Sequence, residues 1–421
     1  MDVTEASRIG PIAVISMHAD PLAPLGAGQN GGMNLAIRRL VEALGRRGVT
    51  CDVFTRRADA EVPHQEMLGE LSRVIRLPVG PAQVLPPAET VDWAPAMLAA
   101  IIEHSRLQRR EYALIHAHHW VAGLVAEPLR DSWQVPWAHS FHTLARVKHT
   151  AGLHAEPGRD QMEARWVAGA DRLIAISRSE ARELQEYYGA DPDRTCVVQL
   201  GADQETSTAN NPEELRARLG LSGHRVILYA GRLEPLKGAE TLLDAIACLV
   251  AGPGYDDVVA LIVGDDAQDG ERDRLEQIAV SRGINGRVRF VGSVAHDDLG
   301  DYYSVADVCV VPSRAESFGL VALEAQAAGT AVIAANVGGL REIVEDGVSG
   351  ILVEPGDVTG FCHRIAEVLG DPALSVRMGE AGRRRAGAYT WDRAAARLEA
   401  IYALMRSSNP TAPCADSGVL G

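Results

Sequence analysis

Two glutamates stand eight residues apart in the segment ESFGLVALE, which runs from Glu316 to Glu324. The segment follows an apolar run, ADVCVVPS, and continues into an alanine-rich stretch, so it predicts a loop that opens a helix. Backbone amides at the N-terminus of a helix bind phosphate and sugar hydroxyl groups. A carboxylate on the loop can contact a sugar, and one inside the helix can bind a ribose diol. The alternative is a capping carboxylate beside an unrelated helix glutamate.

Two cations follow a strand in a second segment, GRLEPLKG, at residues 231–238. Arg232 and Lys237 come just after the apolar run RVILYA, at the strand edge where open α/β sheets bind ligands. A forked guanidinium and a compact ammonium together suit a diphosphate. The chain has two lysines among 41 basic residues, so a lysine at this point carries information. Surface ion pairing is the alternative.

A glycine-rich loop, GAGQNGG, contains the spacing G-x-G-x-x-G at Gly26, Gly28 and Gly31. This spacing is typical of NAD-dependent dehydrogenases, but there the first glycine directly follows the strand, whereas HADPLAPL intervenes here. The acidic residue expected at the end of the second strand is also misplaced, because Asp52 lies near its beginning. The context favours a loop whose last amides open a helix and face a phosphate or sugar. A plain loop stays open as an alternative.

Histidines gather near the ends of several expected strands. Three of them, His116, His118 and His119, crowd as metal ligands do, but strand alternation puts the first two on one face and the third opposite. A zinc site is therefore not expected. His142 lies in the strand-like run WAHSFHT, where it is either a site residue or a core histidine. His18 ends the first strand beside the glycine-rich loop.

Short β-branched runs alternate with amphipathic stretches along the whole chain. This pattern predicts an α/β protein with two Rossmann-like, doubly wound parallel-sheet domains that face a central cleft. The expected strands are PIAVISM, TCDVFT, SRVIRLPV, YALIHAH, WAHSFHT, DRLIAIS and TCVVQLG, then RVILYAG, VVALIVGD, VRFVGSV, ADVCVVPS, AVIAAN and GILVEPG.

The polar stretch ADQETSTANNP is the expected linker between the two domains. We expect an N-terminal domain at 1–203 and a C-terminal domain at 204–389, which bind acceptor and donor on the resemblance described below. A helix at 390–406 is expected to pack back on the N-terminal domain, and 407–421 is expected to be a disordered tail.

Composition limits the class of protein. The net charge of −15 argues against nucleic acid as the main partner, because phosphate binding needs a basic surface. No apolar run approaches the roughly 18 residues that would span a membrane, and the first run does not resemble a signal peptide. The six cysteines are dispersed, which favours core thiols in a reducing cytoplasm. A cytoplasmic protein is expected, and a homodimer stays open.

These segments resemble the retaining glycosyltransferases of family 4, which have the two-domain GT-B fold. Glu316 and Glu324 match the E-x7-E motif of the family, and residues 231–238 match its G-R-L-x-x-x-K-G segment. ISMHADPL, GGMN, HAHHW and HSFHTLARVK look like mycothiol-pathway D-inositol-3-phosphate N-acetylglucosaminyltransferases and related 2-deoxystreptamine N-acetylglucosaminyltransferases of aminoglycoside biosynthesis. The resemblance covers the chain up to about residue 405.

The resemblance implies a UDP-sugar as donor and co-substrate, with N-acetylglucosamine expected and glucose left open. Arg232 and Lys237 would bind the diphosphate, and Gly32 would approach it. Glu324 would bind the ribose. The donor sugar and β-phosphate would be held by the Glu316 carboxylate and by the amides of Ser317, Phe318, Gly319 and Leu320.

For the chemical step, the resemblance implies that the acceptor hydroxyl attacks on the face from which the leaving group departs. The leaving phosphate takes the proton, and the protein positions the reactants and stabilises charge. The implied catalytic residues are His142, Glu316, Arg232 and Lys237. The cations make a metal unnecessary in principle, and a bound Mg²⁺ stays open.

The acceptor side departs from the resembled enzymes. They hold an acceptor phosphate with a lysine, a tyrosine, a threonine and an arginine. Thr143 and Arg159 match two of these and His119 replaces the tyrosine, but QVLPPAETVDW contains no cation where the lysine should be. Gln29-Asn30 also replaces an acidic position before the GGMN segment. The implied acceptor-binding residues are His18, Asn34, His119, Thr143 and Arg159.

The missing lysine favours an unphosphorylated cyclitol acceptor, because a charged hydrogen bond contributes roughly 1.5–3 kcal/mol. The expected activity is transfer of N-acetylglucosamine to 2-deoxystreptamine in aminoglycoside antibiotic biosynthesis. Transfer to D-inositol 3-phosphate is the main alternative. An NAD-dependent dehydrogenase and a sugar-nucleotide-binding regulator are alternatives from other classes.

Overall fold

The protein is described from a computed structural model, which covers residues 9–23, 31–203, 212–266, 270–407, 409–410 and 412–414. Gly26, Gly28 and Gln29-Asn30 lie outside the described residues, as do most of the expected linker and the end of the expected tail. The described chain divides into two compact units. Unit 1 comprises the described residues within 9–23, 32–199 and 391–414, and unit 2 comprises Gly31 and the described residues within 200–390.

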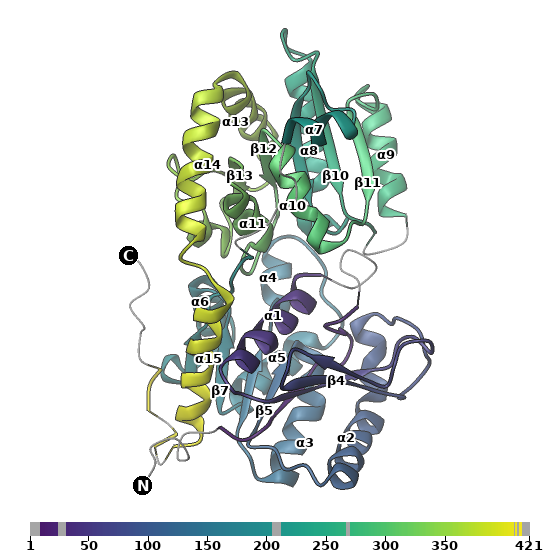
Figure 1. Ribbon diagram of the computed structural model, residues 1–421, viewed down its shortest axis with the longest axis vertical. Coiled ribbons are helices and arrows are strands. Elements are labelled where there is room, and N and C mark those ends of the chain that lie inside the picture. The colour runs from purple at the N-terminus through teal and green to yellow at the C-terminus, as the bar shows by residue number, and fades with distance from the viewer. Residues whose placement is uncertain are drawn as a thin grey trace. The chain divides into compact units, whose positions relative to one another are not determined.

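Unit 1 is built on one sheet (Figure 1). Among the described residues the sheet has eight strands in the order β3-β4-β2-β1-β5-β6-β7-β8. All neighbours are parallel except β3 and β4, which are antiparallel. The strands are β1 (Ile12–Ile15), β2 (Cys51–Arg56), β3 (Gln65–Leu68), β4 (Ser72–Leu77), β5 (Leu114–His118), β6 (Trp137–Ser140), β7 (Arg172–Ala175) and β8 (Thr195–Val197).

The inner strands of unit 1 are buried along their whole length, because helices cover both faces of a parallel sheet. The helices of this unit are α1 (Gly32–Arg46), α2 (Ala94–Gln108), α3 (Gly123–Trp133), α4 (Ala145–Thr150), α5 (Arg159–Gly169), α6 (Arg178–Tyr188) and α15 (Trp391–Met405). Short 3-10 turns include η1 (Pro87–Trp93), η2 (Trp120–Ala122) and η3 (Pro192–Arg194).

Helix α15 lies against α1 in unit 1, although the two are far apart in the sequence (Figure 1). Arg46 and Arg47 of α1 pair with Asp392 and Glu399 of α15 at 2.7 and 2.6 Å. The buried Tyr402 of α15 lies 2.7 Å from Nδ1 of His116 on β5. The last long helix of the chain is therefore part of unit 1.

Unit 2 repeats the plan with a smaller sheet (Figure 1). Among the described residues it has six strands, all parallel, in the order β11-β10-β9-β12-β13-β14. They are β9 (Arg225–Ala230), β10 (Val258–Val263), β11 (Val288–Gly292), β12 (Val308–Val311), β13 (Val332–Ala335) and β14 (Ile351–Val353). The helices are α7 (Pro212–Arg218), α8 (Ala239–Val250), α9 (Glu271–Ser281), α10 (His296–Val305), α11 (Leu320–Ala328), α12 (Leu340–Ile343), α13 (Val358–Gly370) and α14 (Pro372–Ala386), with the turn η4 (Pro235–Lys237).

The two parallel-sheet units and all the expected strands are confirmed, with three differences. Strand β3 was not expected, because its QEML sequence is exposed at three of four positions and lacks a buried face. The run WAHSFHT is a strand only as far as Ser140, so the expectation that His142 lies on it is wrong. Four of the six cysteines form the pairs Cys196–Cys414 and Cys248–Cys362.

The expectation of six separate thiols is therefore wrong for those four residues. Cys51 and Cys309 are free and buried. The paired residues are 218 and 114 positions apart, so their spacing in the sequence gives no hint of the pairing.

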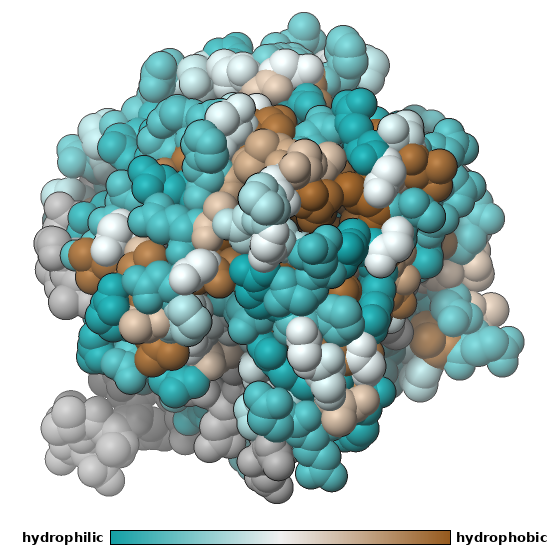
Figure 2. Space-filling model, turned by 90° about the horizontal axis from the view of Figure 1, so that it is seen from above, coloured by the Kyte–Doolittle hydropathy of each residue, from teal (hydrophilic) through white to brown (hydrophobic). Residues whose placement is uncertain are grey.

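Hydrophilic residues make up most of the face seen in Figure 2, and hydrophobic residues lie between them in a few places. Among the described helices, none has both the length and the apolar character required to cross a membrane.

Candidate functional site

The sheet of unit 2 changes direction between β9 and β12. From β9 the chain moves outward to β10 and β11, then returns to add β12 on the other side of β9. The loops that leave the carboxyl ends of β9 and β12 therefore lead in opposite directions, and open α/β sheets bind ligands at such a point. These two loops are the segments that carry Arg232, Lys237 and Glu316.

Glycines allow the loop after β9 to lie close to its neighbours. A Cβ on Gly264 would come within 1.9 Å of the carbonyl oxygen of Gly231. Gly238 has φ +72°, and a Cβ there would come within 2.1 Å of the carbonyl oxygen of Pro312. A side chain at either position would push the two loops apart. Gly238 thus lets the segment that carries Lys237 lie against the loop after β12, and Gly264 lets the loop after β10 lie against Gly231.

Lys237 and Glu316 are brought into contact by this arrangement. The Lys237 Nζ lies 2.7 Å from Oε2 of Glu316, and both side chains are mostly buried. The hydroxyl of Ser313 lies 3.4 Å from the same carboxylate oxygen. One carboxylate oxygen is therefore engaged by a lysine and a serine at the carboxyl edge of the sheet.

Arg232 has a carboxylate partner of its own. Its guanidinium lies 2.8 Å from Oε1 of Glu234, as an ion pair rather than an aligned hydrogen bond. Its backbone oxygen accepts from the buried Tyr229 hydroxyl at 3.0 Å. Burial and the nearby Glu234 raise the pKa of Tyr229, so this hydroxyl keeps its proton and remains a donor.

The loop that begins at Glu316 rests on a glycine pair. The amide of Gly339 donates to the backbone oxygen of Glu316 at 2.8 Å. A Cβ on Gly339 would come within 2.5 Å of the Phe318 backbone. Gly319, with φ +104°, is the N-cap of α11, which begins at Leu320. The first amides of a helix lack partners within the helix, so the amide of Leu320 can face a ligand, and Ser317 and Phe318 lie on the loop just before the N-cap.

Glu324 is the fifth residue of α11 and is buried. The hydroxyl of Tyr303 donates to its Oε2 at 2.9 Å. Burial and the Glu324 carboxylate raise the pKa of Tyr303 well above its usual value, so the tyrosine stays protonated. Nε2 of His296 lies 3.9 Å from the other oxygen, Oε1, and 3.8 Å from Asp203. Glu324 is thus held in one orientation.

Sequence reasoning missed Tyr303 and His296. In the run AHDDLGDYYSVAD a tyrosine at helical spacing is indistinguishable from a core residue. His296 begins α10 and carried no motif signal. Only the fold reveals that α10 packs against α11 and reaches Glu324.

In unit 1, the strands β1, β5 and β6 are neighbours and end together. Ile15 pairs with Ala117, and His118 pairs with Ser140. The sheet changes direction between β1 and β5, so this edge is also a topological switch point. The predicted residues His18, His119, His142 and Thr143 all follow directly after these three strands.

Two histidines at this edge have unusual backbone conformations. His119 has φ 72° and ψ 157°, in a region that is almost reserved for glycine. His142 has φ 64°. Such strain persists only where the surroundings enforce it, and it gathers at functional sites.

The ring of His142 is held by another histidine. Its Nε2 lies 2.9 Å from Nδ1 of His118, and one of the two nitrogens donates to the other. Burial lowers the pKa of His142 to about 4. Burial, together with His116 and His142, lowers the pKa of His118 well below its usual value. Both rings are therefore neutral at pH 7.

His18, His119 and Asn34 also lie at this edge. The His18 and His119 rings are 4.4 Å apart between centroids. Burial, then the neighbouring His18 and Arg159, lower the pKa of His119 well below its usual value. The Asn34 amide donates to the Asp20 backbone oxygen at 2.9 Å, and Asp20 pairs with Arg76. Gly32 begins α1.

Arg159 and Thr143 are in direct contact. The Arg159 guanidinium is fully buried and donates to the Thr143 hydroxyl and carbonyl oxygens at 2.9 and 2.8 Å. It also pairs with Glu163 at 2.6 Å and with Glu156 at 3.0 Å. Its centre lies 5.8 Å from the Trp120 ring. The predicted arginine is thus fixed by two acidic side chains.

The predicted residues are distributed over both units, and those in contact with one another are in contact in pairs. Within unit 2, Lys237 contacts Glu316, while Arg232 and Glu324 have other partners in neighbouring loops and helices. Within unit 1, Arg159 contacts Thr143, His18 contacts His119, and His142 contacts His118. No described group of three or more His, Cys, Asp or Glu side chains is arranged to hold a metal ion.

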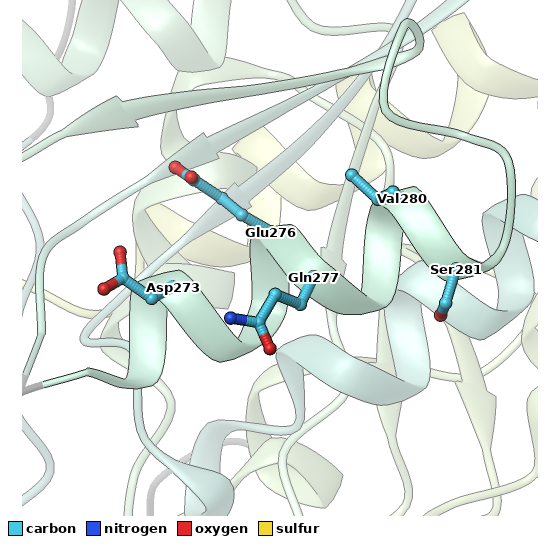
Figure 3. Close-up of a pocket in the computed structure, with 5 residues that line it drawn as sticks. All are labelled: Asp273, Glu276, Gln277, Val280 and Ser281. Carbon is cyan, nitrogen blue, oxygen red and sulfur yellow. The ribbon is translucent and has the colours of Figure 1, made fainter.

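A surface hollow lies elsewhere, along α9 (Figure 3). It is lined by Asp273, Glu276, Gln277, Val280 and Ser281, all from that one helix. Glu276 is already paired with Arg272 at 2.9 Å. The hollow contains none of the predicted residues and no convergent polar groups, so it is not the candidate site.

Both units match known protein families. Residues 31–201 match the family model of the glycosyl transferase 4-like domain, and residues 211–385 match that of glycosyl transferases group 1. The chain is 41% identical to a D-inositol 3-phosphate glycosyltransferase of Geodermatophilus obscurus, over 93% of this chain and 88% of the relative. It is 35% identical to that of Corynebacterium glutamicum, over 93% and 96%.

Solved structures agree with this fold. Sucrose-phosphate synthase from Thermosynechococcus elongatus is 34% identical, with a TM-score of 0.85 over 93% of this chain and 98% of that chain. Anabaena HepE in complex with UDP has a TM-score of 0.70 at 22% identity, over 92% and 98%.

Proposed function

The chain belongs to the GT-B glycosyltransferases of group 1, and on this premise we propose that it transfers a sugar from a UDP-sugar to a hydroxyl of a cyclitol with retention of configuration. D-inositol 3-phosphate is the first candidate acceptor. The observation that carries the proposal is the Lys237–Glu316 contact at the carboxyl edge of β9 and β12. Family membership also removes the dehydrogenase interpretation of the glycine-rich loop.

For the donor, the proposal assigns the diphosphate to the two cations after β9. Lys237 and Arg232 carry positive charge to the strand edge, and Glu316 and Glu234 hold them there. A departing diphosphate gains negative charge, which positioned cations and helix amides stabilise. The amides of Ser317–Leu320 at the start of α11 are the second source of this stabilisation.

The ribose is assigned to Glu324. Tyr303 donates to Oε2 and His296 lies 3.9 Å from Oε1, so these two side chains orient the carboxylate that is assigned to the sugar diol. The carboxylate is buried, so a hydrogen bond to it gains strength from the low local dielectric.

His142 is proposed to act as a neutral hydrogen-bond partner of the transferring sugar. Its pKa of about 4 means that it carries no charge at pH 7. His118 holds its Nε2, so Nδ1 is the ring nitrogen assigned to contact with a substrate. The acceptor proton passes to the leaving phosphate, so the protein supplies orientation rather than a general base.

The acceptor assignment follows the curated relatives, whose names specify D-inositol 3-phosphate. Thr143 and Arg159, expected to bind the acceptor phosphate, are in contact and lie in unit 1. The sequence argument for 2-deoxystreptamine depended on the missing lysine alone. Identity of 35–41% over nearly the whole chain favours the alternative.

2-Deoxystreptamine remains the second candidate because of the acidic side chains at Arg159. Glu156 and Glu163 both pair with this arginine, and the Glu156 side chain is 24% exposed. An accessible carboxylate suits an ammonium group better than a phosphate.

A product assay tests the proposal. The purified protein is mixed with UDP-GlcNAc or UDP-glucose and with inositol 3-phosphate, myo-inositol or 2-deoxystreptamine, and products are identified by mass spectrometry. A gain of one sugar on inositol 3-phosphate supports the first candidate. A gain on 2-deoxystreptamine alone supports the second. No product with any pair contradicts the proposal.

A further inference from the structure

Lys148, in the last turn of α4, lies beside the buried Arg159. Its Nζ is 3.8 Å from Oε2 of Glu156, and NH1 of Arg159 is 3.0 Å from the same oxygen. Two cations from two helices therefore converge on one carboxylate oxygen. Lys148 is also one of only two lysines in a chain that otherwise uses arginine.

The members of this cluster differ in accessibility. The side chains of Lys148 and Glu156 are 23% and 24% exposed, whereas that of Arg159 is 1% exposed. A solute can therefore reach the lysine and the glutamate, and the arginine forms the floor of the cluster.

The two glutamates of the cluster are held differently. Glu163 is fully buried, and its carboxylate also accepts from the Ala145 amide at 2.8 Å and from the Tyr188 hydroxyl. It is thus part of the framework that fixes Arg159. Glu156 sits at the surface between the two cations. Burial opposes its ionisation, but Arg159 and Lys148 outweigh burial and lower the pKa of Glu156.

A buried polar atom points to a ligand at this cluster. Nδ1 of His119 has no hydrogen-bond partner among the residues that the structure describes, and the residue is 8% exposed. Lys148 and Arg159 both contribute to the electrostatic environment of this ring. Buried polar atoms are generally hydrogen-bonded, so an unpartnered one beside two cations calls for a polar group from outside the chain.

We propose that Lys148 binds the anionic group of the acceptor together with Arg159 and Thr143, and that this group displaces the carboxylate of Glu156. A phosphate in that position meets the two cations that now hold the carboxylate, and the Thr143 hydroxyl lies next to Arg159. The inference rests on the proposed function. It assigns Lys148 as a residue that selects a phosphorylated acceptor.

This assignment explains the missing lysine. No cation occurs in residues 83–93, where the resembled enzymes are expected to have one. Lys148 of α4 lies in the segment HSFHTLARVK, which looks like the resembled enzymes, so a cation is present beside Arg159 although residues 83–93 supply none. A phosphorylated acceptor is then compatible with the sequence.

The test compares four variants with the wild type. Lys148→Ala removes the proposed ligand, Lys148→Arg keeps the charge, and Glu156→Gln removes the competing carboxylate. Arg106→Ala, which removes an exposed cation on α2 that is paired only locally with Glu103, is the matched control. Thermal unfolding verifies that each variant folds. KM for inositol 3-phosphate, KM for UDP-GlcNAc and kcat are measured for each.

For Lys148→Ala we expect KM for inositol 3-phosphate to rise about tenfold or more, with KM for UDP-GlcNAc within about twofold of wild type. Lys148→Arg should recover most of the loss. Glu156→Gln should lower KM for inositol 3-phosphate several-fold, and Arg106→Ala should change nothing. An unchanged KM for inositol 3-phosphate in Lys148→Ala overturns the inference.

The experiment distinguishes a failure of the role assigned to Lys148 from a failure of the proposed acceptor. If the wild type transfers sugar to inositol 3-phosphate but Lys148→Ala has the same KM, only the role of Lys148 is overturned. If the wild type transfers sugar to 2-deoxystreptamine alone, and Glu156→Gln raises KM for it, both the acceptor assignment and the role of Lys148 are overturned. Glu156 then binds an ammonium group.

Discussion

Lys237 and Glu316 are 79 positions apart in the sequence, yet Nζ and Oε2 of the two side chains lie 2.7 Å apart. The contact joins the loop after β9 to the loop after β12, the two loops that diverge at the switch point of the sheet in unit 2. Each segment was picked out separately in the sequence. The fold places them at one site, which is what a shared role in holding a sugar diphosphate requires.

Lys237→Ala should lower kcat by orders of magnitude while the protein stays folded. The ammonium is assigned to the leaving diphosphate, where a positioned charge acts mainly in the transition state. The substitution leaves the mostly buried Glu316 carboxylate without its cation, so stability should also fall, by roughly 1–3 kcal/mol. Steady-state kinetics and thermal unfolding measure both effects. Arg274→Ala, which removes an exposed paired cation from α9 in the same unit, should leave kcat unchanged.

Gly238→Ala should weaken UDP binding and destabilise the protein. The new Cβ would lie 2.1 Å from the Pro312 oxygen, in a backbone conformation with φ +72°. The loops that carry Lys237 and Glu316 must then separate. Gly223→Ala is a close control, since its φ is +77° but a Cβ there meets nothing within 4 Å. Equal effects of the two substitutions on UDP affinity, measured by calorimetry, would mean that the contact with Pro312 does not matter.

Tyr303→Phe should weaken UDP-sugar binding several-fold and leave the acceptor KM unchanged. The tyrosine hydroxyl orients Glu324 through a 2.9 Å hydrogen bond but is not itself assigned to a substrate. Removing the hydroxyl should cost about 1 kcal/mol of stability, because a buried acceptor loses its partner. A variant that loses stability yet binds UDP normally would show that Tyr303 is only a packing residue.

The stability of the protein should fall between about pH 6.5 and pH 4 because buried histidines must be protonated on unfolding. The pKa of His142 in the folded protein, about 4, is below the usual value of 6.5. The unfolded chain therefore binds more protons in this window, and stability is complete above pH 6.5 and lost as pH falls toward 4.

His142→Gln should reduce this pH dependence by about one proton, or roughly 1.4 kcal/mol per pH unit. His116, His118, His119 and His139 have lowered pKa values as well, so part of the slope should remain. Urea unfolding at pH 7 and pH 5 measures the difference. The same slope in the variant and the wild type would show that His142 titrates normally.

Much of the fold could be predicted from the sequence because buried parallel strands are continuous runs of apolar residues. IAVI and VVALIV are apolar at every position and are buried at every position. Strand β3 could not be read, since three of its four residues are exposed and it is fixed only by antiparallel pairing with β4. Cysteine pairs that are more than a hundred residues apart likewise depend on the fold alone.

Site residues could be predicted from the sequence where they lie in short motifs, and could not be predicted where only tertiary packing brings them to the site. Glu316 and Lys237 lie in short segments with recognisable spacing. Tyr303 reaches Glu324 only because α10 packs on α11, and Lys148 reaches Glu156 only because α4 lies beside α5. For the same reason the sequence suggested that a second cation was missing, although α4 places one beside Arg159.

The central claim is that the protein moves a sugar from UDP to a cyclitol hydroxyl. The most direct measurement uses UDP-GlcNAc isotope-labelled at the anomeric carbon, together with inositol 3-phosphate and the purified wild type, followed by NMR. The account predicts a new labelled anomeric signal with the donor's α configuration that correlates with a carbon of the cyclitol ring. A signal from free sugar alone, or an unchanged donor when UDP-GlcNAc and UDP-glucose are each tried with inositol 3-phosphate and 2-deoxystreptamine, would contradict it.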